Sequence, residues 1–249
     1  MVEYNIPPRN FGTIYVENID LTDSTNTNTK YGYEALNSIT TAESGVFFGY
    51  ESGKSLTTGN ANTFVGRETG KDITTGVNNV AIGYRALRDV SSSISYICAV
   101  GFGALQKTTG GTNSAFGYLC LNKCEGGNSN TAMGYTSAYN VTSGSKNCFY
   151  GKNSGYSITT GDNNIMIGED AGNNASQKVD GDNMILIGEG IYSDESNIVK
   201  IGNSNTNKTE FAGASQAAFV ADATDLTSVI TLSNALKTLL VNYKFMASS

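Results

Sequence analysis

Apolar and polar positions recur along this chain with a 17-residue period, and a glycine that follows an apolar residue marks each period. The steps between nine such glycines are 17, 17, 17, 18, 16, 17, 17 and 17. We call these the repeat glycines: Gly32, Gly49, Gly66, Gly83, Gly101, Gly117, Gly134, Gly151 and Gly168. Two less regular copies follow at Gly188 and Gly202. A fixed period of this size is typical of a solenoid, in which each repeat forms one coil stacked on the next.

Two columns of apolar residues emerge when the repeats are aligned on the glycine. The residue before the glycine forms the pre-glycine column: Phe48, Val65, Ile82, Val100, Phe116, Met133, Tyr150, Ile167, Ile187 and Ile201. The residue seven positions after it forms the seventh-residue column: Ile39, Leu56, Ile73, Val90, Thr108, Cys124, Val141, Ile158 and Ala175. We expect both columns to point into a core, which predicts two short strands per coil, stacked at about 4.8 Å. Ten such coils make a rod on the order of 50 Å long.

The turns between the apolar columns are equally regular. A Thr-Thr-Gly sequence or a close variant recurs, as at residues 57–59, 74–76 and 159–161. Glycine there is expected to supply the positive φ of a tight turn. An asparagine stands three residues after each turn glycine: Asn62, Asn79, Asn113, Asn130, Asn147 and Asn164. We interpret these asparagines as a stacked structural ladder, because asparagine can hydrogen-bond within its own turn.

The period ends near Gly213, and a helix signal follows it. Apolar residues then fall at steps of three and four, as in a heptad seam: Val229, Leu232, Leu236, Leu239, Tyr243 and Met246. The chain therefore divides into an attachment or capping segment (1–27), the repeats (28–203), a transition (204–221) and a C-terminal helix (222–249). The helix either clamps chains that already lie side by side or folds back to cap the open solenoid.

Composition and charge exclude several functions. The formal net charge is −6 and no cluster of Lys and Arg occurs, so nucleic acid is a poor partner. No apolar run reaches the roughly 20 residues that span a bilayer, so no membrane insertion is expected. The first residues also lack the basic-then-apolar pattern of a secretory signal.

Candidate chemistry is sparse. The chain contains no histidine, which removes Ser-His and Cys-His nucleophile systems and histidine metal sites. Glu169 and Asp170 are adjacent, and the Asp-Gly-Asp-Asn stretch at 180–183 is best explained as a solvated turn. We therefore expect no catalytic residues, no resident metal and no cofactor. The four cysteines fall in regular positions of the repeat, and we expect all of them to be buried free thiols: Cys98, Cys120, Cys124 and Cys148.

One column has a different character. The residue after each repeat glycine is aromatic in most coils, and we call this the aromatic column: Tyr33, Tyr50, Arg67, Tyr84, Phe102, Tyr118, Tyr135, Lys152 and Glu169. Its rings either pack within or between subunits, or form a row that stacks on sugar rings, since amphipathic rings suit wet binding surfaces. The candidate ligand-binding residues are its aromatic members: Tyr33, Tyr50, Tyr84, Phe102, Tyr118 and Tyr135.

The repeats also resemble a known family. Runs such as NNVAIGYRAL (78–87) and NNIMIGEDAG (163–172), joined by Thr-Thr-Gly turns, resemble the head repeats of trimeric autotransporter adhesins and similar runs in phage and large-virus tail or fibre proteins. Residues 197–214 look like the segment that ends the repeats in many viral fibres. The resemblance covers roughly residues 28–214. It implies a left-handed parallel β-roll, three chains side by side and adhesion to a host surface.

Two departures shape the expected function. The adhesin repeat is usually shorter than the repeat of this chain, and the sequence shows no long coiled-coil stalk or membrane barrel, so a virion fibre fits better than an autotransporter. We expect a non-enzymatic, homotrimeric fibre head on the virion surface that binds a host-surface glycan or receptor, with residues 1–27 on a virion base protein. The alternatives are a bacterial-surface location, a purely structural spacer and a polysaccharide-degrading β-solenoid spike.

Overall fold

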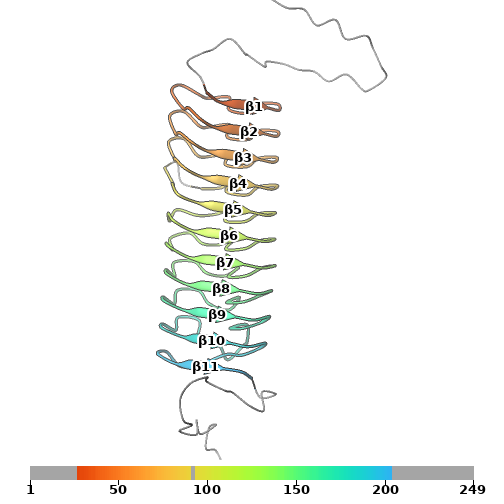
Figure 1. Ribbon diagram of the computed structural model, residues 1–249. Coiled ribbons are helices and arrows are strands. Elements are labelled where there is room, and N and C mark those ends of the chain that lie inside the picture. The colour runs from red at the N-terminus through yellow and green to blue at the C-terminus, as the bar shows by residue number, and fades with distance from the viewer. Residues whose placement is uncertain (1–26, 91–92, 204–249) are drawn as a thin grey trace, which may run out of the picture. The chain divides into compact units, whose positions relative to one another are not determined.

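Residues 27–203, apart from 91 and 92, form a parallel β-solenoid in the computed structural model (Figure 1). These residues contain no helix, and each coil contributes one three-residue strand. The strands are β1 (Thr29–Tyr31), β2 (Val46–Phe48), β3 (Thr63–Val65), β4 (Val80–Ile82), β5 (Cys98–Val100), β6 (Ser114–Phe116), β7 (Thr131–Met133), β8 (Cys148–Tyr150), β9 (Ile165–Ile167), β10 (Ile185–Ile187) and β11 (Val199–Ile201). They form one sheet in chain order, β1 to β11.

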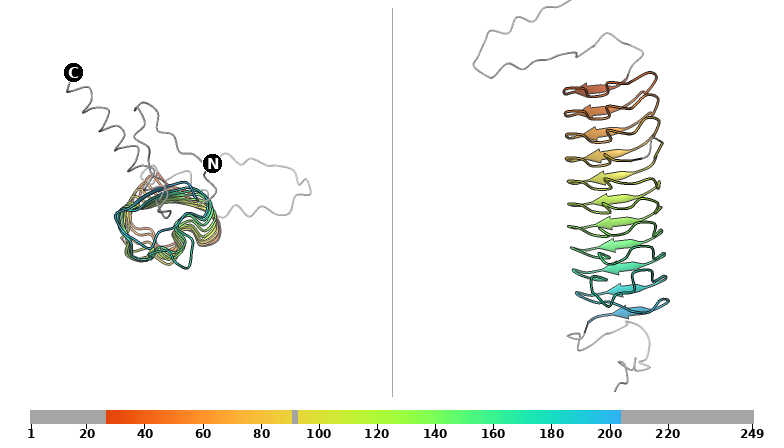
Figure 2. Two further views of the ribbon diagram at one scale, coloured as in Figure 1. Left: turned by 90° about the horizontal axis from the view of Figure 1, so that it is seen from below. Right: turned by 180° about the vertical axis from the view of Figure 1, so that it is seen from behind.

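The register of the sheet follows the spacing of the repeat glycines. Val46 of β2 pairs with Thr63 of β3, one repeat later, and the same offset recurs in most coils. The 18-residue step places Val80 opposite Cys98, and the 16-residue step that follows places Cys98 opposite Ser114. The predicted period is therefore confirmed, including its irregular steps. Viewed along the axis, successive coils superpose closely (Figure 2).

Strands β2 to β10 bury their middle residue, which corrects the predicted core. We call this set the strand-centre column: Phe47, Phe64, Ala81, Ala99, Ala115, Ala132, Phe149, Met166 and Leu186, all fully or almost fully buried. The neighbouring pre-glycine column was expected to face inward but points outward, since side chains alternate along a strand. Both columns are apolar, so hydrophobicity alone did not distinguish them.

The seventh-residue column completes the core, as predicted, although it lies in turns and not in a second strand. Leu56, Ile73 and Ile158 are fully buried, and Thr108 is buried at the same position. Backbone hydrogen bonds still join the coils here, as from Thr57 N to Thr74 O at 2.8 Å. Ala175 is the exposed exception, because its coil is lengthened and the step between paired strands grows, so that Ile165 pairs with Ile185.

Two constraints, the backbone conformation and the space between coils, require glycine at the repeat positions. Gly117 has a φ of 144°, which residues with a side chain rarely adopt. A Cβ at Gly117 would also lie 2.1 Å from the carbonyl oxygen of Gly134 in the next coil. The turn glycines differ from the prediction: Gly59 is not in a positive-φ conformation, but its Cβ would lie 2.0 Å from the carbonyl oxygen of Gly76. Close approach between coils, not φ, explains glycine in the turns.

The predicted asparagine ladder is confirmed as a buried structural device. Asn130 is fully buried, and its side-chain amide donates to the carbonyl oxygen of Gly144 at 2.8 Å. Its side-chain oxygen accepts the backbone N–H of Asn147, at 3.0 Å. The same pair of bonds recurs at Asn147 and Asn164. Each asparagine thus satisfies backbone groups of the next coil that would otherwise be buried without partners.

The cysteines are all free, but only two are buried as expected. Burial raises the pKa of Cys120 to about 12 and that of Cys124 to about 11, so both are protonated small apolar groups. Cys98 is half-buried and Cys148 is exposed. Both are first residues of their strands, β5 and β8, and first residues point to the outside of the sheet.

The segments predicted at the two ends lie outside the described residues. These are the N-terminal segment (1–27, apart from Thr27), the transition (204–221) and the C-terminal helix (222–249).

Replacing Gly117 with alanine is expected to destabilise the solenoid strongly. The substitution Gly117→Ala combines a strained φ, worth about 1–3 kcal/mol, with a collision against the next coil. We expect the thermal midpoint, followed by far-ultraviolet circular dichroism, to fall by at least about 5 °C.

The matched control is Gly126→Ala. A Cβ at Gly126 meets only the Cβ of Ser143, at 3.9 Å, and Gly126 is not in a positive-φ conformation. This variant should melt within about 2 °C of the parent. Equal losses in the two variants would show that close coil contact does not explain the repeat glycines.

Candidate functional site

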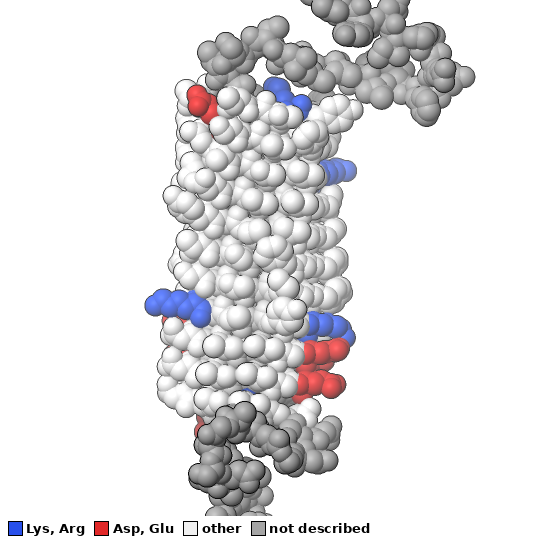
Figure 3. Space-filling view, in the orientation of Figure 1, with Lys and Arg blue, Asp and Glu red and all other residues white. Residues whose placement is uncertain are grey.

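The outer face of the sheet is largely apolar over the whole height of the solenoid. It consists of the first and third residues of β1 to β11, and we call it the outer face. None of these residues is charged. Its largest side chains are well exposed, with Phe48 at 39% and Tyr150 at 56% of their full exposure. The side of the rod in view in Figure 3 is accordingly uncharged over most of its height.

The aromatic column runs beside the outer face, on the other side of the repeat glycines. Its rings stack one coil above another at centroid distances close to the coil spacing. Tyr33 and Tyr50 form one stacked pair at 5.5 Å. Tyr84, Phe102, Tyr118 and Tyr135 form a continuous stack, with successive distances of 5.2, 5.1 and 5.0 Å. The structure therefore brings all six predicted site residues into one column.

Arg67 joins the two aromatic stacks. Its guanidinium carbon lies 5.1 Å from the ring centroid of Tyr50 and 5.9 Å from that of Tyr84. A planar guanidinium can stack on aromatic rings, so it occupies the place of a missing ring. After Tyr135 the column continues as an exposed ion pair, in which Lys152 lies 2.5 Å from Glu169.

Stacking determines which parts of the rings are accessible. Tyr33, Tyr50, Phe102, Tyr118 and Tyr135 are exposed, and Tyr84 is half-buried. The faces of Phe102 and Tyr118 are covered on both sides by neighbouring rings, at 5.0 to 5.2 Å. In the middle of the stack the exposed parts are therefore ring edges and the Tyr118 hydroxyl, whereas Tyr33 and Tyr135, at stack ends, have a neighbouring ring on one side only among the described residues. A ligand along the middle of this column would contact hydroxyls and edges, in contrast to the ring-on-ring stacking that the sequence suggested.

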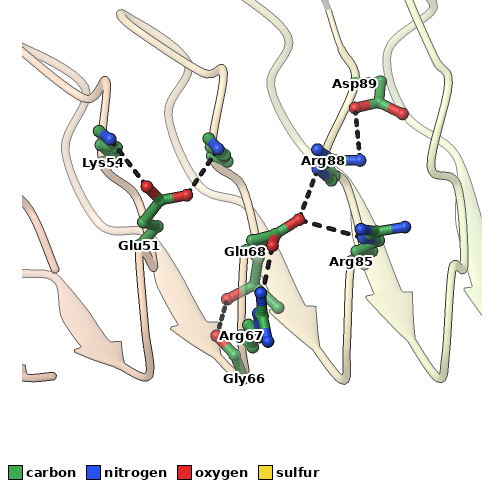
Figure 4. Close-up of polar contacts among 10 residues, drawn as sticks. Glu51, Lys54, Gly66, Arg67, Glu68, Arg85, Arg88 and Asp89 are labelled. Atoms are coloured by element: carbon green, nitrogen blue, oxygen red, sulfur yellow. Dashed lines mark hydrogen bonds and ion pairs between the residues drawn. The ribbon is translucent and has the colours of Figure 1, made fainter. Parts of the chain in front are cut away.

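A charged network flanks the first half of the aromatic column (Figure 4). Glu51 is almost buried and pairs with Lys54 at 2.8 Å and Lys71 at 2.5 Å. Glu68, whose side chain is only 6% exposed, lies one coil further on. Its carboxylate pairs with the Nε atoms of three arginines, at 3.2 Å from Arg67, 3.1 Å from Arg85 and 2.8 Å from Arg88.

These pairings keep both buried carboxylates ionised. Hydrogen bonds from Lys54 and then from Lys71 lower the pKa of Glu51 to about 2. Burial by itself raises the pKa of Glu68, but the hydrogen bond from Arg85 and the positive charges of Arg88 and Arg85 outweigh it. The pKa of Glu68 therefore lies below its ordinary value.

The other carboxylates singled out in the sequence are also partnered. Hydrogen bonds from Asn173 and Asn153 lower the pKa of Asp170. Asp180 pairs with Lys178 at 3.0 Å, and the Asp182 carboxylate accepts the backbone N–H of Asp162 at 2.7 Å. No group of three or more potential metal ligands occurs within the described part of the chain. A search of those residues for a membrane-spanning helix finds no candidate.

Sequence reasoning identified the aromatic column but missed the charged network beside it. The signal was present in the alignment of the repeats. Glu34, Glu51 and Glu68 stand two residues after Gly32, Gly49 and Gly66, and the basic residues Lys54, Lys71 and Arg88 stand five residues after Gly49, Gly66 and Gly83. Two columns of opposite charge at the same period predict ion pairs between neighbouring coils, because stacked coils lie about 4.8 Å apart.

The charged network predicts a loss of stability in acid. The folded pKa of Glu51 is about 2, below its ordinary value of 4.5, so ionised Glu51 stabilises the fold above pH 4.5. That contribution is lost as the pH falls from 4.5 towards 2. We expect the variant Glu51→Gln to show a smaller drop in thermal midpoint over this pH range than the parent protein.

The control is Glu43→Gln, because the Glu43 side chain is exposed and forms no ion pair among the described residues. It should retain the acid profile of the parent. A profile for Glu51→Gln that matches the parent would contradict a stabilising role for the network.

Comparison with known proteins adds no relative. No family model matches the chain, and neither a curated protein nor a solved structure is significantly similar to it. The residues themselves, and the two surfaces that they form, are the basis for assigning a function.

Proposed function

We propose that this chain is the non-enzymatic head of a homotrimeric attachment fibre on a virion, and that it binds a glycan on the host surface. The observation that carries the proposal is the outer face, which is uncharged and largely apolar along eleven strands and yet exposed in the single chain. The resemblance to fibre head repeats adds the expected left-handed coil, three chains side by side and adhesion to a host surface.

The size of the outer face supports assembly. Eleven strands at about 4.8 Å give a strip about 48 Å long, and two outward columns make it roughly 10 Å wide. Its area of about 500 Å² is near the upper limit for an exposed apolar patch on a monomer. Because every residue in the strip is uncharged, further copies of the chain could cover it without burying an ion.

The aromatic column is the better candidate for ligand contact. Arg67 and Lys152 stand in this column with side chains 58% and 54% exposed, and burying them in an interface would be costly. Charged residues of this kind are typical of the rim of an interface. We therefore place the outer face between subunits and the aromatic column at the accessible rim. Weak contacts repeated along three chains would combine into useful avidity.

A structural spacer is the second candidate. The covered ring faces favour it, since stacked rings also stabilise a rod without any ligand. The two functions differ in whether the purified protein binds any saccharide.

Assembly through the outer face is expected to give a trimer that dissociates when one charged residue is introduced into that face. Light scattering should give three times the 26.2 kDa chain mass. In Ile167→Lys a charge enters the outer face, at a position that is exposed in the single chain, so the monomer should fold while the trimer dissociates. A parent protein that scatters as a monomer would remove the basis for the proposal.

The control for this variant is Val179→Lys, because Val179 is an exposed apolar residue outside the outer face. It should remain trimeric. Maleimide labelling supplies a second readout: Cys98 and Cys148 should be protected in the parent but react in Ile167→Lys, whereas Cys120 and Cys124 should react only after denaturation.

Removing a tyrosine hydroxyl is expected to weaken ligand binding without destabilising the fold. Phe102 shows that a phenyl ring fits the stack, so Tyr118→Phe and Tyr135→Phe should leave the melting temperature unchanged. On a glycan array they should weaken binding several-fold, since each removes a hydrogen bond to the ligand. Tyr156→Phe, in the separate Tyr139–Tyr156 stack, is the control. The spacer function would be favoured if the parent protein bound no glycan at all.

A further inference from the structure

Arg67, in the aromatic column, and Arg85, beside it, share one buried carboxylate, that of Glu68. Glu68 engages Arg67 and Arg85 only through their Nε atoms. No protein acceptor within the described residues bonds the terminal amino groups of either side chain. The two terminal nitrogens of each guanidinium, which we call its fork, therefore remain available as donors, in an arrangement that matches a carboxylate.

The surroundings hold both forks in place. The guanidinium carbons of Arg67 and Arg85 lie 5.9 and 4.8 Å from the ring centroid of the same tyrosine, Tyr84. Their Nε atoms bond to different oxygens of the one Glu68 carboxylate, as Figure 4 shows. Buried Glu68 and the rings restrict the arginines before any ligand arrives, which reduces the entropy lost on binding.

The local charge favours an anion. Three arginines surround Glu68, and only one further carboxylate, Asp89, pairs with the set among the described residues, at 3.5 Å from Arg88. Within these ion-paired groups the positive charges exceed the negative charges by one, on a chain whose formal net charge is −6, and Asp72 lies near Arg88 without forming an ion pair with it. Arg67 is also the most exposed of the three arginines, with 58% of its side chain accessible.

We propose that Arg67 and Arg85 bind the carboxylate of an acidic sugar, and that the hydroxyls of Tyr50 and Tyr84 contact the rest of that sugar. This inference rests on the proposed glycan-binding function and specifies the ligand class. A carboxylate fits because it is planar and can accept two parallel N–H bonds from a guanidinium. The aromatic flanks suit the mixed apolar and polar surface of a sugar ring.

The test compares one oligosaccharide in two forms, with full-length protein and calorimetry at low ionic strength. The first form is a galacturonic acid oligomer, and the second is the same oligomer with its carboxyl groups reduced to alcohols. We expect the acidic form to bind at least about tenfold more tightly, equivalent to about 1.4 kcal/mol. A sulfated oligosaccharide of the same length is the third arm, and it should bind less tightly than the carboxylated form.

Three variants distinguish recognition by the guanidinium fork of Arg67 from attraction by positive charge alone. Arg67→Gln should lose about tenfold in affinity for the acidic oligomer. Arg67→Lys keeps the charge but not the fork, and it should lose several-fold. Lys107→Gln removes one exposed positive charge outside the aromatic column and should bind like the parent. Glu68 retains Arg85 and Arg88 in each variant, and thermal melts verify the fold.

The outcomes that would overturn the inference are distinct from those that would overturn glycan binding. Equal affinity for the acidic and reduced oligomers, or preference for the sulfated one, would overturn the carboxylate site and leave glycan binding in place. Equal losses in Arg67→Gln and Lys107→Gln would do the same, because they would indicate attraction by charge alone. The proposed function would be overturned if the parent protein bound none of the three forms and no glycan on the array.

Discussion

Every feature of this molecule depends on the short distance between one coil and the next. The backbones approach so closely that a Cβ on Gly117 or Gly59 would fall about 2 Å from a carbonyl oxygen of the following coil. At that distance the strands pair in parallel and Asn130 reaches the backbone of the coil beyond it. The polar groups of each coil are thus satisfied by its neighbours, and only the side chains at each position of the repeat remain free to vary.

Because the coils superpose, a single position in the repeat becomes a continuous strip of one chemical character. The middle strand residue gives the core, the first and third give the outer face, and the residue after the repeat glycine gives the stack of rings. Charges follow the same rule: Glu51 and Glu68 are nearly buried, and they are tolerated because basic residues of the same and neighbouring coils pair with them. Surfaces on such a fold are linear, and a ligand or a partner meets repeated copies of similar groups.

Much of this arrangement could be predicted from the sequence, because the 17-residue period encodes the register directly. The two irregular steps reappear unchanged in the pairing of Val80 with Cys98 and of Cys98 with Ser114. The direction of the strand residues could not be predicted. Phe47 and Phe48 are both aromatic, one in the core and one on the surface, and only the pleat assigns them. Cys98 and Cys148 were misplaced for the same reason. The column of candidate rings was identified, but the arginine forks depend on side-chain contacts between coils, which a one-dimensional pattern does not specify.

The irregular steps of the sheet have a consequence for how such a chain can change over evolution. The coil after β9 is longer than most, since Ile165 pairs with Ile185, yet the strands on both sides of it keep their parallel pairing. An insertion therefore lengthens only its own coil, and the strand pairing of the other coils is unchanged. By the same reasoning, duplication or loss of one whole repeat unit would change the reach of the rod in steps of about 4.8 Å and leave the chemistry of each strip intact.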